Sequence, residues 1–169
     1  MTTVDTAPAL LTNQQLGQLY QYTVEAYKQF EKLAEWSPNP IVAQMFKQFA
    51  VDEREIRDLV EMKIASLADG AIRSTLGADA LFQDMLEGDL SDRGKTEFLI
   101  SREQAMERKL RSLAAGVTTN DRPLLIYVAA SKRAHIVELE RELELIKLDA
   151  NWFKREDARD RIIHGSAGE

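Results

Sequence analysis

The sequence predicts an all-α protein: a bundle of four long antiparallel helices in one domain spanning residues 1–169. Apolar residues recur in four segments at the three- and four-residue spacing of an amphipathic helix. Prolines and glycines fall between these segments, where a helix has to stop. Only a few residues join the first segment to the second and the third to the fourth, so each pair is expected to form an antiparallel hairpin.

The first expected hairpin consists of helices at about 13–35 and 41–67. Thr12 is a good N-cap for the first helix, because its side-chain oxygen can accept a hydrogen bond from a free backbone N–H. Pro38 and Pro40 prevent that helix from continuing, and the second helix starts directly after them. The joining turn is therefore short.

The second expected hairpin consists of helices at about 95–115 and 123–153. Gly116 ends the third helix, and Pro123 suits the first turn of the fourth. A polar tail, 156–169, follows.

Residues 68–92 separate the two hairpins and carry glycines and aspartates around a short amphipathic piece at 78–86. This length suits a crossover along the side of a bundle. Two hairpins joined by one long connection are the arrangement of the ferritin-like fold, so we expect that topology.

Composition excludes several classes of function. The 22 lysines and arginines against 28 aspartates and glutamates give a net charge of -6, which attracts neither nucleic acid nor an anionic membrane. The chain has no cysteine, which excludes disulfides, iron–sulfur clusters and cysteine nucleophiles. No segment resembles a signal peptide or a membrane span, so we expect a soluble cytoplasmic protein.

Polar residues interrupt the apolar faces near the middle of each helix. At about 100° per residue, Glu53 falls on the apolar face of the second helix and Glu103 on that of the third. Lys132 and His135 share the apolar face of the fourth helix, and Tyr20 is assigned to that of the first. We therefore expect these side chains to meet inside the bundle.

These residues resemble the rubrerythrin branch of the ferritin-like family. Each half of that bundle offers a carboxylate on one helix and Glu-x-x-His on the next, and together they hold two irons. The second helix reads FAVDEREI, so Glu53 matches the family glutamate, but Ile56 stands where the histidine belongs and would fill its space with hydrocarbon. The fourth helix reads AASKRAHI, so His135 matches and Lys132 replaces the glutamate.

The resemblance also implies that the diiron centre is lost. Tyr20 stands at the carboxylate position of the first helix, while the third helix keeps Glu103. Of the six ligand positions, Glu53, Glu103 and His135 survive. The family's rubredoxin module, which needs four cysteines, is not expected in these residues, because they contain no cysteine. The family's peroxidase or ferroxidase chemistry is therefore not expected here.

The favoured interpretation is a structural or interaction protein that is not an enzyme and needs no cofactor. The Lys132 ammonium would occupy the space of the lost metal and neutralise Glu53 and Glu103, with Tyr20 and His135 completing the hydrogen bonds. The resemblance implies a homodimer formed through the exposed surfaces of the first two helices. No nucleic acid or membrane partner is expected.

Two alternatives stay open. Glu53, Glu103 and His135 would suit a single iron, manganese or zinc ion, as in a ferritin-like oxidoreductase or a metal-storage protein. The nearby lysine would repel that cation. A different helix register would instead turn Glu107 or Glu138 inward.

The remaining polar and aromatic features indicate ordinary structural roles. His164 lies in the polar tail and is expected to be exposed. The charge run 138–144, ELERELE, is typical of a solvated helix flank, with a partner-binding face as the alternative. Trp36 and Trp152 are positioned to cap one end of the bundle or to form a dimer contact.

Overall fold

The computed structural model describes residues 10–66 and 90–165, and this part of the chain contains helices and no strands. The predicted all-α class is confirmed. The elements are four long helices, a 3₁₀ turn and a short helix: α1 (Asn13–Trp36), α2 (Pro40–Ala65), α4 (Asp92–Gly116), α5 (Arg122–Leu148), η1 (Trp152–Lys154) and α6 (Ala158–His164). No helix in these residues is long and apolar enough to cross a membrane.

Local capping explains where the long helices begin. The Thr12 hydroxyl accepts from the Gln15 N–H at 3.1 Å, and the Thr12 N–H donates to the Gln15 side chain at 2.9 Å, which forms a capping box. The Asn39 side chain caps α2. Ser91 caps α4 by accepting from the Gly94 N–H, so α4 begins before the expected residue 95.

The fourth helix ends earlier than expected. Asp149 adopts an extended backbone, and its carboxylate accepts from the Asn151 N–H and pairs with Arg155 at 2.8 Å. Because of these contacts, α5 ends at Leu148 and not at the expected residue 153. The expected polar tail is also partly helical, because it contains α6, at whose end His164 is exposed as predicted.

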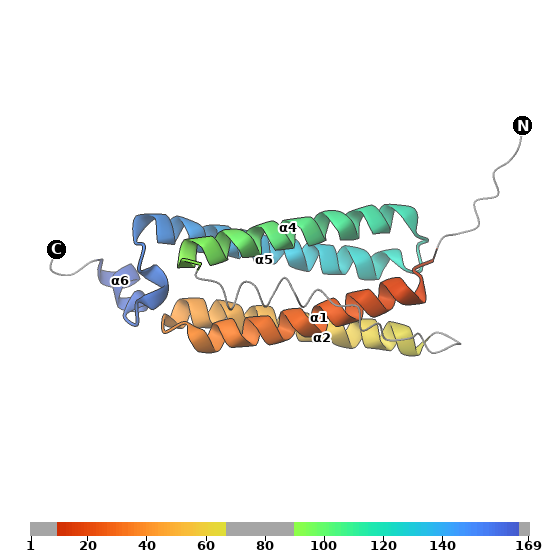
Figure 1. The fold of residues 1–169 in the computed structure, drawn as a ribbon, viewed down its shortest axis with the longest axis horizontal. Coiled ribbons are helices and arrows are strands. Elements are labelled where there is room, and N and C mark those ends of the chain that lie inside the picture. Colours follow the sequence, from red (N-terminus) through yellow and green to blue (C-terminus); the bar gives the residue numbers. More distant parts are fainter. Residues whose placement is uncertain (1–9, 67–89, 166–169) are drawn as a thin grey trace, which may run out of the picture.

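The long helices form two hairpins (Figure 1). The helix α1 runs beside α2, and α4 runs beside α5, in opposite directions within each pair. The two hairpins meet where α2 packs against α5. Most of the expected crossover, including its amphipathic piece at 78–86, lies outside the described residues.

Two apolar clusters fill the interior. The first is rich in aromatic residues and includes Phe30, Phe46 and Phe49. The second consists of aliphatic residues such as Leu16 and Val60. Along α2, α4 and α5, the change from one cluster to the other falls at the predicted polar residues. A polar layer therefore divides the core, and its charges are far from water.

Hydrogen bonds connect η1, which follows α5, to the turn between α1 and α2. The Trp152 indole N–H donates to the Glu142 carboxylate at 2.7 Å, and Glu142 is fully buried. The Asn39 amide donates to the Trp152 carbonyl at 2.7 Å, and the Ser37 hydroxyl to the Phe153 carbonyl at 3.0 Å. Trp152 thus covers this end, while the expectation that the whole run 138–144 is solvated is wrong for Glu142.

Replacing a glutamate of α5 should cost more stability at the buried position 142 than at the exposed position 144. Glu142→Ala leaves the Trp152 N–H without its acceptor and should lower the free energy of unfolding by about 1–3 kcal/mol. Glu144→Ala, on the exposed side of the same helix, should change it by less than about 0.5 kcal/mol. Urea denaturation of both variants measures the difference, and equal effects would show that the Glu142 contact does not stabilise the fold.

Candidate functional site

Four buried ionisable side chains meet in the polar layer, and we call them the ionic cluster: Glu53 of α2, Glu103 of α4, and Lys132 and His135 of α5. The Lys132 ammonium donates to Glu53 Oε1 and lies 3.3 Å from Glu103 Oε2. All four residues are 0% exposed. The structure brings together these four of the side chains that were expected to meet inside the bundle, whereas Tyr20 lies elsewhere.

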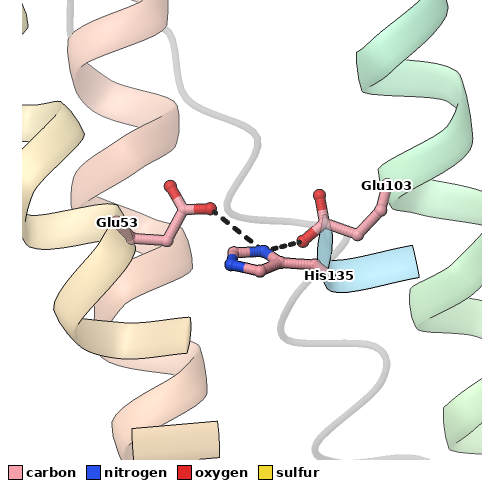
Figure 2. A group of neighbouring side chains, drawn as sticks. All are labelled: Glu53, Glu103 and His135. Atoms are coloured by element: carbon pink, nitrogen blue, oxygen red, sulfur yellow. Dashed lines mark hydrogen bonds and ion pairs between the residues drawn. The ribbon is translucent and has the colours of Figure 1, made fainter. Parts of the chain in front are cut away.

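The positions of these residues on their helices explain why they meet. Lys132 and His135 are three residues apart on α5 and therefore share one face. Glu53 reaches the same layer from α2, and Glu103 reaches it from α4. Figure 2 shows the His135 ring lying between the two glutamates. The cluster thus links both helical hairpins.

His135 is held between carboxylates on both sides of its ring. Nδ1 lies 3.5 Å from Glu103 Oε1, and Nε2 lies 2.9 Å from Asp52 Oδ2. The Phe49 ring stacks on the imidazole with centroids 4.0 Å apart. Burial alone would lower the pKa of His135, but the hydrogen bonds to Asp52 and Glu103 raise it. The charged imidazolium, which donates from both nitrogens, suits this position.

Asp52 is the part of the site that the sequence analysis missed. It is half-buried, and it connects His135 to the protein surface. Burial raises its pKa, but the hydrogen bonds from His135 and Gln48 outweigh this effect and lower it. No sequence signal identifies Asp52, because the contact joins two helices that are far apart along the chain.

The buried charges stabilise one another. Burial by itself raises the pKa of Glu103, but the positive charge of Lys132, the hydrogen bond to His135 and the charge of Arg102 together lower it to about 2. Burial lowers the pKa of Lys132, yet Glu103 and Glu53 raise it above its ordinary value. Arg102 lies 3.8 Å from Glu103. Three carboxylates, with Asp52, thus face three cations.

The tyrosine beside the cluster is Tyr22, whereas the sequence analysis assigned Tyr20. The Tyr22 hydroxyl lies 3.5 Å from Glu103 Oε2, and the Lys132 ammonium sits 4.8 Å from the centre of its ring. Burial, and then the charge of Glu103, raise the pKa of Tyr22 to about 12. Tyr20 is only half-buried and packs against the aliphatic cluster.

The helical period explains this difference. The residues Tyr22, Ala26 and Phe30 are buried and follow one another at four-residue intervals along α1. Tyr20 is two residues, or about 200°, away from Tyr22 and points elsewhere. The spacing of the resembling family, which points to Tyr20, does not match the buried face of this helix.

The other candidate positions lie outside the ionic cluster. Ile56 is buried among the aliphatic residues, one turn of α2 away from Glu53, where it occupies space with hydrocarbon. Glu107 is buried too, but it pairs with Arg133 and Arg111 on the flank of α4 and α5. Glu138 is half-buried. The alternative register would have turned Glu107 or Glu138 toward the centre of the ionic cluster, and neither residue lies there.

Three members of the cluster could hold a metal ion. Ligand atoms of Glu53, Glu103 and His135 lie within 4.8 Å of one another, and two carboxylates with an imidazole suit iron, manganese or zinc. However, Lys132 contacts both glutamates and is charged. A divalent cation would have to displace this ammonium, so the residues as placed do not fit a metal and the lysine together.

Removing the lysine should destabilise the protein in a pH-dependent way. Lys132→Ala removes the ammonium that Glu53 and Glu103 share, and we expect a loss of about 3–5 kcal/mol of unfolding free energy. In the wild type, the ionised Glu103 contributes stability above the unfolded pKa of about 4.3 and loses it as pH falls toward about 2. In the variant, the largest influence that lowers the pKa of Glu103 is gone. We expect burial to outweigh the remaining charges of His135 and Arg102 and to raise this pKa above its unfolded value, so the loss should grow from about pH 5 to pH 8.

Urea denaturation in metal-free buffer at both pH values measures this loss. Lys147→Ala, at an exposed position of the same helix, is the matched control and should cost less than about 0.5 kcal/mol at either pH. A Lys132→Ala penalty below about 1 kcal/mol that does not vary with pH would contradict the proposed charge balance.

The imidazole of His135 should titrate above its ordinary pKa of about 6.5. Its contribution to stability is then complete below about pH 6.5 and is lost as pH rises through the raised folded-state pKa. In a His164→Ala background only this histidine remains, so NMR reports one titration. Adding Asp52→Asn should lower its pKa, whereas adding Asp58→Asn, at an exposed site on α2, should not. Identical titrations in the two variants would exclude Asp52 as the cause.

Comparisons of the chain with protein-family models, with curated proteins and with solved structures found no significant match. The chemistry of the ionic cluster therefore has to follow from its own residues and their surroundings.

Proposed function

We propose that this is a non-catalytic, rubrerythrin-like protein in which a buried lysine takes the place of the lost diiron centre. The observation that carries the proposal is the Lys132 ammonium, fully buried and in contact with both Glu53 and Glu103. A buried carboxylate needs a compensating charge, and an ammonium supplies it as a metal ion would. The cluster then has a structural role, because it links α2, α4 and α5.

The proposal includes a ferritin-like arrangement, with four antiparallel helices and a crossover between α2 and α4. Two features support it: the hairpins α1–α2 and α4–α5, and the packing of α2 against α5. The polar layer also lies in the core between facing helices, which is where such bundles carry their metal ligands.

The protonation states argue against acid–base or nucleophilic catalysis by the cluster. Lys132 is an ammonium and has no free electron pair for attack on a substrate. Glu103, with a pKa of about 2, is too weak a base to take a proton efficiently near neutral pH. The positive and negative groups of the ionic cluster pair with each other, so the role that we propose for this protein is structural or one of interaction.

A homodimer is part of the proposal. The outward surface of α2 carries three exposed apolar side chains: Val51, Leu59 and Met62. Apolar groups that are grouped on one helix face suit contact with a second protein surface. This helix belongs to the hairpin through which the family resemblance implies dimerisation.

A single-metal protein is the second candidate. Besides the three converging ligand atoms, Glu53 Oε2 is buried and has no hydrogen-bond donor within reach in the described part of the chain. A cation would satisfy this oxygen, provided that Lys132 moved away. The two candidates therefore differ in whether the ammonium or a metal neutralises the glutamates.

Elemental analysis distinguishes these candidates. Protein produced in iron-supplemented medium should carry far less than the two irons per chain of a diiron centre, because the ammonium excludes a dication. Lys132→Ala should gain affinity for Zn²⁺ through Glu53, Glu103 and His135, and Zn²⁺ should raise its melting temperature.

The matched control is Lys132→Ala combined with His135→Ala, which should lose the Zn²⁺ effect. Wild-type protein with close to one or two tightly held metals per chain would overturn the lysine-for-metal proposal. One metal would instead establish the second candidate.

A further inference from the structure

A cavity opens on the side of the molecule away from the α2–α5 contact. The helices α2 and α5 pack together, whereas among the described residues α1 and α4 make no comparable backbone approach. Between them lies a cavity of about 320 Å³. Pockets for small organic ligands have volumes from about 300 Å³ upward, so this one can take a small molecule.

Most of the cavity wall is aliphatic. The wall is formed by α1, by α4, by the start of α5 and by the residue before the α1 cap, and its apolar members are Leu11, Leu19, Met106, Leu110, Leu113 and Leu125. Such a wall favours a hydrocarbon chain over a polar ligand, because the chain leaves water without losing hydrogen bonds. The unbranched side chain of Met106 can adapt to its shape.

Tyr22 closes the inner end of the cavity. Tyr22 lines the cavity, and the Lys132 ammonium lies 4.8 Å from the centre of its ring, so Tyr22 belongs both to the cavity wall and to the surroundings of the ionic cluster. A ligand chain therefore ends at Tyr22 and does not need to reach the buried charges. The cavity is a separate site.

The polar part of the wall favours one negative charge. Among the described residues that line the cavity, Lys109 is the charged one, it is exposed, and none is an aspartate or glutamate. This is distinctive in a chain with a net charge of -6. The exposed Gln18 adds a neutral donor and acceptor. A single anionic head group would meet an ammonium without facing a carboxylate.

We propose that this cavity binds a medium-chain alkyl monocarboxylate. The hydrocarbon chain lies among the leucines, and the carboxylate pairs with Lys109 at the opening. Binding of this kind goes beyond the structural role of the ionic cluster and does not depend on it.

Calorimetric titration with decanoate, below its micelle concentration, tests the proposal. Wild-type protein should bind one decanoate per chain. Leu113→Trp fills the cavity and should weaken binding at least about tenfold, while Val137→Trp, at an exposed position of α5, should leave it unchanged. Lys109→Gln should weaken decanoate binding by about tenfold and leave 1-decanol unaffected. Lys28→Gln, an exposed lysine of α1, is the charge control and should behave as wild type.

An independent readout needs no variant. In protein labelled at the methionine methyl groups, decanoate should shift the NMR signal of Met106, which lines the cavity, and leave that of the exposed Met62 in place. Absence of saturable binding, equal shifts of both methyl groups, or full-strength binding by Leu113→Trp would overturn the proposed site. Equal weakening by Lys109→Gln and Lys28→Gln would overturn the role of Lys109 in recognising the carboxylate.

Discussion

The structure depends on one buried ammonium group that contacts two carboxylates. Without Lys132, Glu53 and Glu103 would lose the cation that they share in a layer that excludes water, where proteins tolerate a charge only when it is paired and hydrogen-bonded. Such a pair adds little stability compared with well-packed hydrocarbon, but losing one partner is costly. The cluster therefore fixes how the helices fit together more than it strengthens the core.

This constraint explains the division of the interior. An aromatic cluster lies on one side of the polar layer and an aliphatic cluster on the other, so a register shift of α5 would move its lysine into hydrocarbon. Tyr22 connects the layer to the cavity, since its ring contacts the ammonium on one side and lines the cavity on the other. At the aromatic end, the hydrogen bond between Trp152 and Glu142 similarly pairs a buried carboxylate with a donor.

Much of the fold and the centre of the site could be predicted from the sequence, because both depend on periodicity within single helices. A rotation of 100° per residue identifies the ionic cluster as buried without knowledge of its partners. The sequence-based predictions are wrong where a contact joins segments that are far apart along the chain. They are also wrong where a residue is placed by the spacing of the resembling family and not by the helical period of about 100° per residue. Asp52 meets His135 across two helices, and Glu142 is hidden in a charge run because its donor, Trp152, lies ten residues later. The family spacing points to Tyr20, whereas the buried face of α1 carries Tyr22.

The central claim is that Lys132 is a charged, water-excluded ammonium, and NMR of its side-chain nitrogen tests this most directly. In ¹⁵N-lysine-labelled protein, we expect one slowly exchanging ammonium signal that is missing from Lys132→Ala. Since the neighbouring glutamates raise the pKa of Lys132, that signal should persist at a pH above the ordinary lysine pKa of about 10.4. A neutral amine signal, or an ammonium signal that exchanges with water as fast as those of the surface lysines, would contradict the account.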